Sequence, residues 1–392
     1  MPQYRYLIVG GGMTADAAVR GIREVDPSGS IGLIGTDPHP PYDRPPLTKG
    51  LWKGKAFETI WRHTEETDAE LHLGRSVVAL DPAERRVRDD RGEEHTFERL
   101  LLATGGTPRR LPFGDEHIIY YRTADDYQRL RALSERGERF AVIGGGFIGS
   151  EITAALAMNG RRVTILLRAP GIGAEIFPEG LSRYLNGYYA ERGVEVLESD
   201  AAAGVEADGD ALILTTEAGR RLRVDGIVAG IGIEPNTALA RGAGLTVEDG
   251  VVVDEFLRTT HSDIFAAGDV ASFSNPALGE VLRVEHEDNA NTMGKTAGRN
   301  MAGATDLYHH LPFFYSDLFD LGYEAVGDLD PRLDVVEDWQ EPYHKGVVYY
   351  LREHRVKGVL LWNVWEQVDQ ARQLIAEFGP FRPGDLAGRL PA

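Results

Sequence analysis

The fold is decided by two stretches of the same design, Leu7-Ile8-Val9-Gly10-Gly11-Gly12-Met13-Thr14-Ala15 and Phe140-Ala141-Val142-Ile143-Gly144-Gly145-Gly146-Phe147-Ile148-Gly149. Each runs from a predicted strand through a glycine-rich turn into a predicted helix. This order places a pyrophosphate at the N-terminus of the helix. One such motif is weak evidence, because glycine-rich turns are common. Two in one chain predict a protein that holds two dinucleotides.

The composition is that of an ordinary globular protein. The chain has 392 residues, of which 42% are hydrophobic and 26% charged, enough for two or three domains. No apolar stretch approaches the roughly 18–20 residues needed to span a bilayer, so we expect no stable membrane insertion. Met1 to Tyr6 lead straight into the first predicted strand without a signal-peptide pattern. We therefore expect a cytoplasmic protein, either a monomer or a homodimer.

Cysteine is absent from the chain. This excludes disulfide frameworks, iron–sulfur ligation and thiolate nucleophiles. It also excludes the redox-active cysteine pair through which thioredoxin- and glutathione-type flavoprotein reductases pass electrons onward. Any electrons that the protein takes up must therefore leave directly from a cofactor.

The net charge of −19 argues against nucleic acid as a partner. It also weakens docking to an acidic carrier protein unless the chain offers a local basic patch. Candidates for such a patch are Arg109, Arg110, Arg283 and Arg299.

Two βαβ units organise the chain. The first is predicted to contain strand 4–9, helix 15–24 and strand 30–34, and the second strand 139–143, helix 149–159 and strand 162–167. Further strands are predicted at 195–198, 211–215, 225–231 and 263–267, followed by a helix from about Glu287 to Met301. The last eighty or so residues alternate apolar and polar positions at 346–351 and 358–363 before a final helix at 367–377.

The predicted fold class is α/β, with two Rossmann-like dinucleotide-binding domains and a C-terminal α+β domain. We predict an FAD-binding domain over residues 1–112 and 244–312, interrupted by an NAD(P)H-binding domain over 113–243. Residues 313–392 form the C-terminal domain in this division.

Gly10, Gly12 and Ala15 occupy the three small positions of the first fingerprint, with Met13 and Thr14 between them. They allow the turn, the approach of the backbone to a pyrophosphate and the close packing of helix on strand. An acidic residue after the second strand usually binds a ribose hydroxyl. Asp37, beside Thr36, is the candidate, although it also fits an ordinary turn with Pro38.

The second fingerprint has Gly144, Gly146 and Gly149, with Phe147 and Ile148 between them, and Glu151 on the predicted first helical turn. Its second strand ends in Leu167 and Arg168, without the acidic residue that NAD readers usually have. A cation there suits the 2′-phosphate of NADPH. NADPH use or dual specificity is favoured, with a solvent-facing Arg168 as the alternative.

Three further motifs recur in one flavoprotein family: residues 42–49 (YDRPPLTK), 102–109 (LATGGTPR) and 232–236 (GIEPN). The chain resembles the FAD-dependent pyridine nucleotide-disulfide oxidoreductase-like reductases that lack the redox disulfide. That family includes oxygenase-type ferredoxin reductases, rubredoxin reductases and apoptosis-inducing factor. Residues 105–109, 284–288 (VEHED), 312–317 (PFFYSD) and 322–327 (GYEAVG) are most similar to apoptosis-inducing factor.

The resemblance implies roles for individual residues. Lys49 and Glu151 are implied as a catalytic pair beside the flavin N5, and Asp269 as the residue that holds the ribityl chain. The segment 285–287 opens a helix whose positive end faces the flavin. Tyr315 stands where relatives commonly carry Trp, which puts the details of nicotinamide stacking in doubt.

The complete sets of expected cofactor contacts follow. For FAD they are Gly10, Gly12, Met13, Thr14, Ala15, Thr36, Asp37, Arg44, Lys49, Val78, Ala103, Thr104, Gly105, Arg122, Gly268, Asp269, Glu285, His286, Glu287 and Tyr315. For NADH or NADPH they are Gly144, Gly146, Phe147, Ile148, Gly149, Glu151, Arg168 and Gly232.

No metal site is expected. The histidines at 63, 72, 95, 309 and 310 lack zinc-site spacing with a supporting second pair. The aromatic residues Tyr349, Tyr350, Trp362 and Trp365 favour core packing of the C-terminal domain over a role in partner docking.

Two functions of different class remain open. The leading one is an NAD(P)H oxidoreductase that passes electrons from flavin to a ferredoxin or rubredoxin. The other, implied by the likeness to apoptosis-inducing factor, is a redox-sensing flavoprotein whose slow turnover and long-lived charge-transfer state serve partner binding. Reduction of quinones or oxygen is a further alternative.

Overall fold

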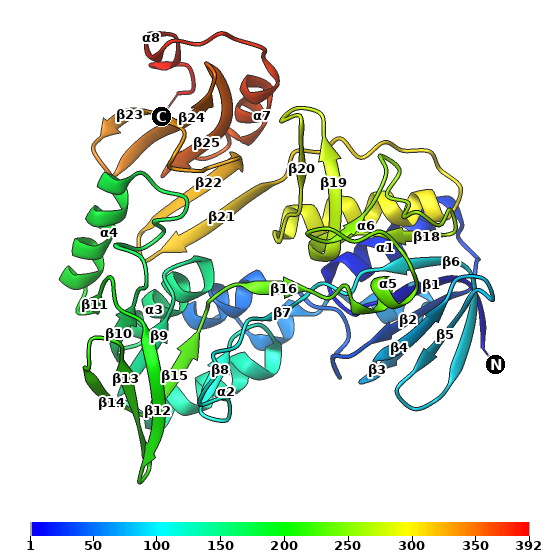
Figure 1. The fold of residues 1–392 in the computed structure, drawn as a ribbon, viewed down its shortest axis with the longest axis horizontal. Coiled ribbons are helices and arrows are strands. Elements are labelled where there is room, and N and C mark those ends of the chain that lie inside the picture. The colour runs from blue at the N-terminus through cyan, green and yellow to red at the C-terminus, as the bar shows by residue number, and fades with distance from the viewer. Residues whose placement is uncertain (1, 392) are drawn as a thin grey trace. The chain divides into compact units, whose positions relative to one another are not determined.

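The computed structural model describes residues 2–391, which form two compact units. The first unit comprises the segment that ends at Asp43 together with Glu58–Thr107 and Glu234–Pro312. The second comprises Arg44–Phe57, Pro108–Ile233 and the segment that starts at Phe313. The sheet with the first glycine turn belongs to the first unit, and the sheet with the second turn to the second unit (Figure 1).

The main sheet of the first unit has the order β3-β2-β1-β6-β5-β4, and β18 also pairs with β6. Its strands are β1 Gln3–Val9, β2 Ile31–Gly35, β3 Glu70–Leu73, β4 Val77–Asp81, β5 Arg86–Asp89, β6 Glu94–Leu102 and β18 Ile264–Ala266. The first three, β6 and β18 are parallel, whereas β4, β5 and β6 form an antiparallel meander. Ile8 lies between Leu33 and Leu101 in this register. Such continuous apolar pairing is typical of a strand covered on both faces.

Two helices, α1 (Met13–Val25) and α6 (Glu287–Met301), pack against each other through glycines (Figure 1). A Cβ atom on Gly294 would lie 2.4 Å from the carbonyl oxygen of Thr14, and one on Gly298 would lie 2.1 Å from that of Ala18. Larger residues would therefore force the helices apart. The smaller elements of this unit are α5 Ala238–Gly242, β17 Val251–Val252, β19 Ala271–Asn275 and β20 Glu280–Leu282, with 3₁₀ turns η4 Thr64–Thr67 and η5 Gly268–Val270. A further 3₁₀ turn, η3 Phe57–Ile60, has its first residue in the second unit and the others in this one.

The second unit contains a parallel sheet of order β11-β10-β9-β15-β8. Its strands are β8 Ile118–Tyr120, β9 Arg139–Ile143, β10 Arg162–Leu166, β11 Glu195–Leu197 and β15 Gly226–Ala229. The helices are α2 Ala124–Arg136, α3 Phe147–Met158 and α4 Glu179–Glu191, and β12 Ala202–Asp208, β13 Ala211–Thr216 and β14 Arg221–Val224 form a separate meander. The segment Arg44–Phe57 adds two 3₁₀ turns, η1 Pro45–Leu47 and η2 Gly50–Lys53.

An antiparallel sheet of order β21-β22-β25-β24-β23 forms the C-terminal part of the second unit. Its elements are β21 Phe313–Leu318, β22 Leu321–Gly327, β23 Asp334–Glu341, β24 Lys345–Arg352, β25 Arg355–Trp362, α7 Val368–Ala376 and α8 Pro383–Leu386. Phe177 packs its ring edge against Tyr323 and Trp362, at centroid distances of 5.2 and 5.4 Å. These contacts join the C-terminal sheet to the loop before α4. The short strands β7 Gly106–Pro108 and β16 Ile233–Pro235 pair where the chain passes between the units.

The predicted α/β class and the paired βαβ units are confirmed, whereas the three-domain division stays a prediction. Both fingerprint helices begin two residues earlier than predicted, because Gly12 and Gly146 are the N-caps. Glu151 therefore lies on the second turn of α3, and its predicted place on the first turn was wrong. Tyr349, Tyr350 and Trp362 are fully buried, as core packing requires, but Trp365 is 49% exposed and does not belong to the core.

No helix within residues 2–391 is long and apolar enough to cross a membrane.

Candidate active site

The first glycine turn connects β1 to α1 in the first unit. Gly10 has a φ of +136°, and a Cβ atom on it would lie 2.1 Å from the carbonyl oxygen of Ala103. Only glycine fits this position. Gly12 caps α1 without a side-chain hydrogen bond, which leaves the first N–H groups of the helix available to an anion. Ala15 is fully buried, as the close packing of helix on strand requires.

The turn after β18 packs onto the start of α1. Gly268 has a φ of +78°, and a Cβ atom on it would lie 2.3 Å from Oγ1 of Thr14. Asp269 follows directly and is half-buried. The glycine contacts between α1 and α6 hold a second helix N-terminus in the same unit, where His286 is the N-cap without a side-chain capping bond. The structure thus collects the predicted contacts of residues 10–15, 268–269 and 286–287 in one unit.

Asp37 follows β2 and forms a turn. Its Oδ1 accepts the backbone N–H of His39 at 3.0 Å, and its Oδ2 accepts the hydroxyl of Tyr42 at 2.8 Å. The hydroxyl of Thr36 lies 3.1 Å from that of Ser76. Asp37 therefore forms the ordinary turn that its sequence position before Pro38 also allows. Each carboxylate oxygen keeps a further lone pair, so its contact with a ribose stays a prediction.

The other predicted FAD contacts of the first unit lie at strand ends and turns. Ala103 provides the carbonyl beside Gly10, and the Thr104 hydroxyl donates to the carbonyl of Asn236 at 2.8 Å. Gly105 has a φ of +61°. Val78 lies on β4 and is 56% exposed, and Glu285 is exposed and paired with Arg283 at 2.6 Å.

Arg44, Lys49, Arg122 and Tyr315 belong to the second unit. Arg44 is the N-cap of η1, and the backbone N–H of Arg122 donates to Oδ2 of Asp126 at 3.0 Å just before α2.

Thr123 and Asp126 form the capping box that begins helix α2. That signal was present in the sequence, and neither α2 nor α4 was predicted.

The second glycine turn has the geometry that its sequence predicts. A Cβ atom on Gly144 (φ +106°) would lie 2.3 Å from the carbonyl oxygen of Gly230, and one on Gly149 would lie 1.9 Å from that of Gly144. Packing therefore leaves no room for a side chain at either of these two glycines. Gly146 differs, since a Cβ atom there would meet nothing within 4 Å. It is an exposed N-cap of α3 without a side-chain hydrogen bond, as a backbone that accepts a pyrophosphate requires.

Arg168 follows the buried Leu167 at the end of β10 and is exposed. Within residues 2–391 it forms no ion pair or hydrogen bond. Gly232 has a φ of +88° and is exposed, with only the Arg109 side chain near its Cβ position, at 3.8 Å.

Glu151 is the centre of a buried polar cluster in the second unit. It projects from α3 and is 3% exposed. Its Oε1 accepts hydrogen bonds from Nζ of Lys49 and Oγ of Ser316, both at 2.6 Å, and its Oε2 accepts one from Oγ1 of Thr48 at 2.5 Å. The structure therefore confirms that Lys49 and Glu151 pair. Three charge-assisted donors compensate the buried carboxylate.

Aromatic side chains lie on the same elements as this cluster. Nζ of Lys49 lies 5.1 Å from the ring centroid of Tyr315, and Phe147 packs edge-on against Phe314 at 5.4 Å. Burial raises the pKa of Tyr189, whose hydroxyl donates to the carbonyl of Ser150 at 3.1 Å. Its phenol therefore stays neutral beside Glu151.

Sequence reasoning missed Thr48 and Ser316. Both stand directly beside residues of the predicted site, Thr48 before Lys49 and Ser316 after Tyr315. They therefore lie within the motifs 42–49 and 312–317. Their role was not visible because their partner, Glu151, lies more than one hundred residues away in the sequence from either of them.

The four arginines expected to form a basic patch are largely compensated. Arg110 pairs with Asp115 at 2.5 Å, Arg283 with Glu285 at 2.6 Å, and Arg299 with Asp306 at 2.6 Å. The guanidinium of Arg109 donates to the carbonyl of Ile233 at 3.3 Å.

Comparison with known proteins gives the family. The model of pyridine nucleotide-disulphide oxidoreductases matches residues 4–294. The chain belongs to this family. The model of the C-terminal domain of the mitochondrion-associated apoptosis-inducing factor matches residues 297–341 and 334–377. This member has no cysteine, so it lacks the disulfide for which the family is named.

Relatives of both predicted kinds are found. The chain is 33% identical to apoptosis-inducing factor 1, mitochondrial, of Dictyostelium discoideum, over 95% of this chain and 78% of the relative. It is also 33% identical to the ferredoxin--NAD(+) reductase component of the anthranilate 1,2-dioxygenase system of Burkholderia cepacia, over 97% and 96%. The solved covalent complex of putidaredoxin reductase and putidaredoxin contains a chain that matches with a TM-score of 0.92 and 29% identity, over 99% and 96%.

The protein is an NAD(P)H-dependent flavoprotein oxidoreductase that binds FAD and NAD(P)H. Its residues fit these groups. Each unit has a glycine turn that leads to a helix N-terminus without a side-chain cap, and the turn at Gly146 leaves open space where a side chain would be. The individual cofactor contacts remain predictions.

Proposed function

We propose that this protein oxidises NAD(P)H and transfers the electrons to a small iron–sulfur carrier of the ferredoxin class, with rubredoxin as the other carrier to test. The absence of cysteine carries the proposal, because electrons then leave directly from the flavin. The ferredoxin reductase component of Burkholderia cepacia and the putidaredoxin reductase complex support it. A cytoplasmic location is part of the proposal, although the Dictyostelium relative is described as mitochondrial.

Bound FAD supplies the acceptor for a hydride and the donor for single electrons. The chain supplies binding sites and a fixed electrostatic environment. The N-termini of α1 and α3 offer N–H groups to pyrophosphates. Glu151 holds the ammonium of Lys49 at one position, and Thr48 and Ser316 fix the carboxylate in turn. We propose that this ordered positive charge stabilises negative charge on the reduced flavin.

We also propose that the protein uses NADPH at least as well as it uses NADH. β10 ends without an acidic residue to bind a 2′-hydroxyl, and Arg168 is exposed and without a partner among residues 2–391. The name of the Burkholderia relative specifies NAD(+), so the preference of this chain between NADH and NADPH is inferred from its own residues. Arg168→Glu should lower the preference for NADPH over NADH at least tenfold. The control is Arg221→Glu, an exposed arginine on β14, and equal ratios in both variants contradict the proposed role.

A second function is favoured by the match to the apoptosis-inducing factor C-terminal model. In it the protein oxidises NADH slowly, and its reduced form binds partners. Stopped-flow reduction by NADH and NADPH, followed by mixing with ferredoxin, rubredoxin, quinone or oxygen, separates the two. Rapid reduction and rapid oxidation by ferredoxin support the reductase. Slow reduction and a reduced form that persists with every acceptor support the sensor and overturn the reductase.

A further inference from the structure

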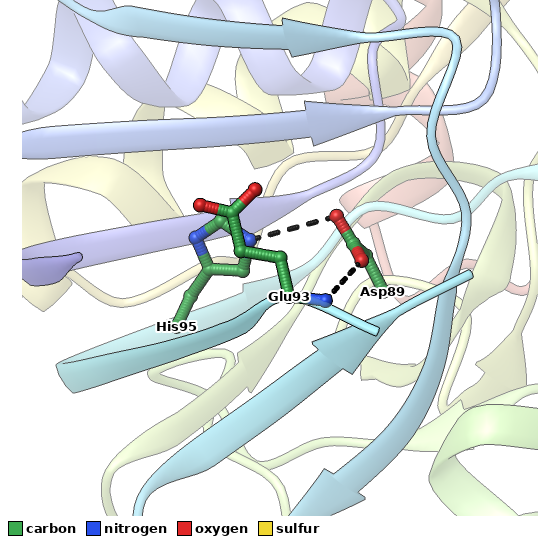
Figure 2. A group of neighbouring side chains, drawn as sticks. All are labelled: Asp89, Glu93 and His95. Atoms are coloured by element: carbon green, nitrogen blue, oxygen red, sulfur yellow. Dashed lines mark hydrogen bonds and ion pairs between the residues drawn. The ribbon is translucent and has the colours of Figure 1, made fainter. Parts of the chain in front are cut away.

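A cluster of titratable side chains lies at the β5–β6 hairpin of the first unit and contains none of the predicted cofactor contacts. Asp89 ends β5, Glu93 lies in the turn, and His95 is on β6 opposite Val87. Figure 2 shows the three side chains directed toward one another. Their nearest donor atoms all lie within 4.8 Å of one another.

The hairpin turn fixes the orientation of Asp89. Its Oδ1 accepts the backbone N–H groups of Arg91 at 3.0 Å and Glu93 at 2.8 Å. Its Oδ2 is thereby directed to Nε2 of His95, at 3.7 Å (Figure 2). This distance is too long for a hydrogen bond.

His95 is an unsatisfied polar group in the interior. Its side chain is fully buried, and within residues 2–391 neither ring nitrogen has a hydrogen-bond partner. The neighbouring His72 ring, at 5.0 Å, does not help, because its Nε2 is bonded to the hydroxyl of Tyr4 at 2.7 Å. A buried polar atom without a partner is rare in proteins and destabilises the fold, so such an atom points to a missing ligand.

The charges of the cluster do not balance. Asp89 and Glu93 both pair with Arg75, Asp89 at 3.0 Å, which leaves two carboxylates against one guanidinium. Two carboxylates that share one guanidinium can accommodate a further positive charge.

We propose that Asp89, Glu93 and His95 bind a divalent metal ion of the zinc type. One imidazole nitrogen and two carboxylate oxygens are donors that Zn²⁺ accepts, at roughly 2.0–2.2 Å each. Shifts of roughly 1 Å bring the three donors to such distances. Glu93 is 40% exposed and provides the path of entry. The ion stabilises the β5–β6 hairpin, and it is a structural site separate from the nicotinamide and flavin chemistry.

Arg75 is the competitor for this site. Its side chain is 21% exposed at the rim of the cluster, so the guanidinium can turn to solvent when a metal ion takes over its carboxylates. Loss of this cationic side chain should therefore strengthen metal binding.

The test uses the FAD-loaded protein after removal of metal by a chelator. Zn²⁺ affinity is measured by competition with a chromophoric chelator, and Co²⁺ binding by its visible absorption. We expect Glu93→Gln and His95→Ala to weaken Zn²⁺ binding at least tenfold, Arg75→Ala to strengthen it, and Zn²⁺ to raise the melting temperature of the unmodified protein. Glu93 lies in a partly exposed turn, so Glu93→Gln remains informative where His95→Ala fails to fold.

The matched control is His63→Ala. His63 also has two carboxylates nearby, Glu65 at 3.6 Å and Glu66 at 3.9 Å, but its side chain is 58% exposed. This variant should bind Zn²⁺ as the unmodified protein does. Equal affinities in the unmodified protein, His63→Ala and Glu93→Gln, or no binding at all, overturn the proposal. Reduction by NAD(P)H is unaffected in either case, so the test is independent of the proposed function.

Discussion

The ammonium of Lys49 lies 2.6 Å from Oε1 of Glu151, and this carboxylate is 3% exposed. A nearby pair, Lys53 and Asp317, is longer at 3.3 Å and about half exposed on both sides. The two pairs involve lysines of the same short segment but differ in burial. This difference makes Lys53 a control for Lys49.

Lys49→Met should lower the free energy of unfolding by about 3 kcal/mol, because it leaves a buried carboxylate without its cation. It should also slow flavin reduction by NAD(P)H at least tenfold if the ordered charge assists the reaction. Urea unfolding and stopped-flow absorbance measure the two effects. Lys53→Met should cost less than about 1 kcal/mol and leave the rate unchanged. Equal rates of flavin reduction in Lys49→Met and Lys53→Met would show that Lys49 does not assist the reaction.

Thr48 and Ser316 are positioning residues in this structure, since they act through Glu151. Ser316→Ala and Thr48→Val should each destabilise the protein by about 2 kcal/mol, the typical value of a hydrogen bond to a charged group. Because both hydroxyls bond one carboxylate, the double variant should not show the sum of the two effects. Urea unfolding of the three variants measures the coupling. Strict additivity would show that the cluster does not act as a unit.

The sequence was sufficient for the two glycine turns, because their backbone geometry demands residues without side chains. It also predicted the Lys49–Glu151 pair, but only through the family resemblance. Thr48 and Ser316 were not predictable, because packing brings them to Glu151 from segments more than one hundred residues away. The cluster around His95 lies on one hairpin, but its spacing of one histidine and two carboxylates matches no zinc motif, and its burial is not visible in the sequence. The helices of both fingerprints were placed two residues late because glycine was not recognised as the N-cap.

The hydrogen bond between Tyr6 and Asp26 predicts how stability depends on pH. Burial and this bond, 2.8 Å long, raise the pKa of Tyr6 to about 12. Since the unfolded value is about 10, this stabilisation is complete below pH ~10 and is lost as the pH rises toward about 12. The same bond lowers the pKa of Asp26, so that contribution is present above pH ~4 and is lost as the pH falls further.

Tyr6→Phe removes both contributions. It should be less stable than the unmodified protein at pH 7, and the difference should shrink above pH ~10 and below pH ~4. Thermal melts of both proteins between pH 3 and 11 measure this difference. A difference that stays constant over that range would show that the tyrosine contributes by packing alone.

Substitution of Gly146 should change nucleotide binding without disturbing the fold. Its φ of −77° is open to any residue, and a Cβ atom on it would meet nothing within 4 Å. Gly146→Ala should therefore fold with a stability within about 1 kcal/mol of the unmodified protein. If a pyrophosphate approaches this backbone, the added methyl group raises the KM for NAD(P)H at least tenfold. Gly187→Ala, at an equally open glycine inside α4, should leave KM unchanged. Gly149→Ala, whose Cβ would lie 1.9 Å from a carbonyl oxygen, should instead destabilise the fold. An unchanged KM in Gly146→Ala would place the pyrophosphate elsewhere.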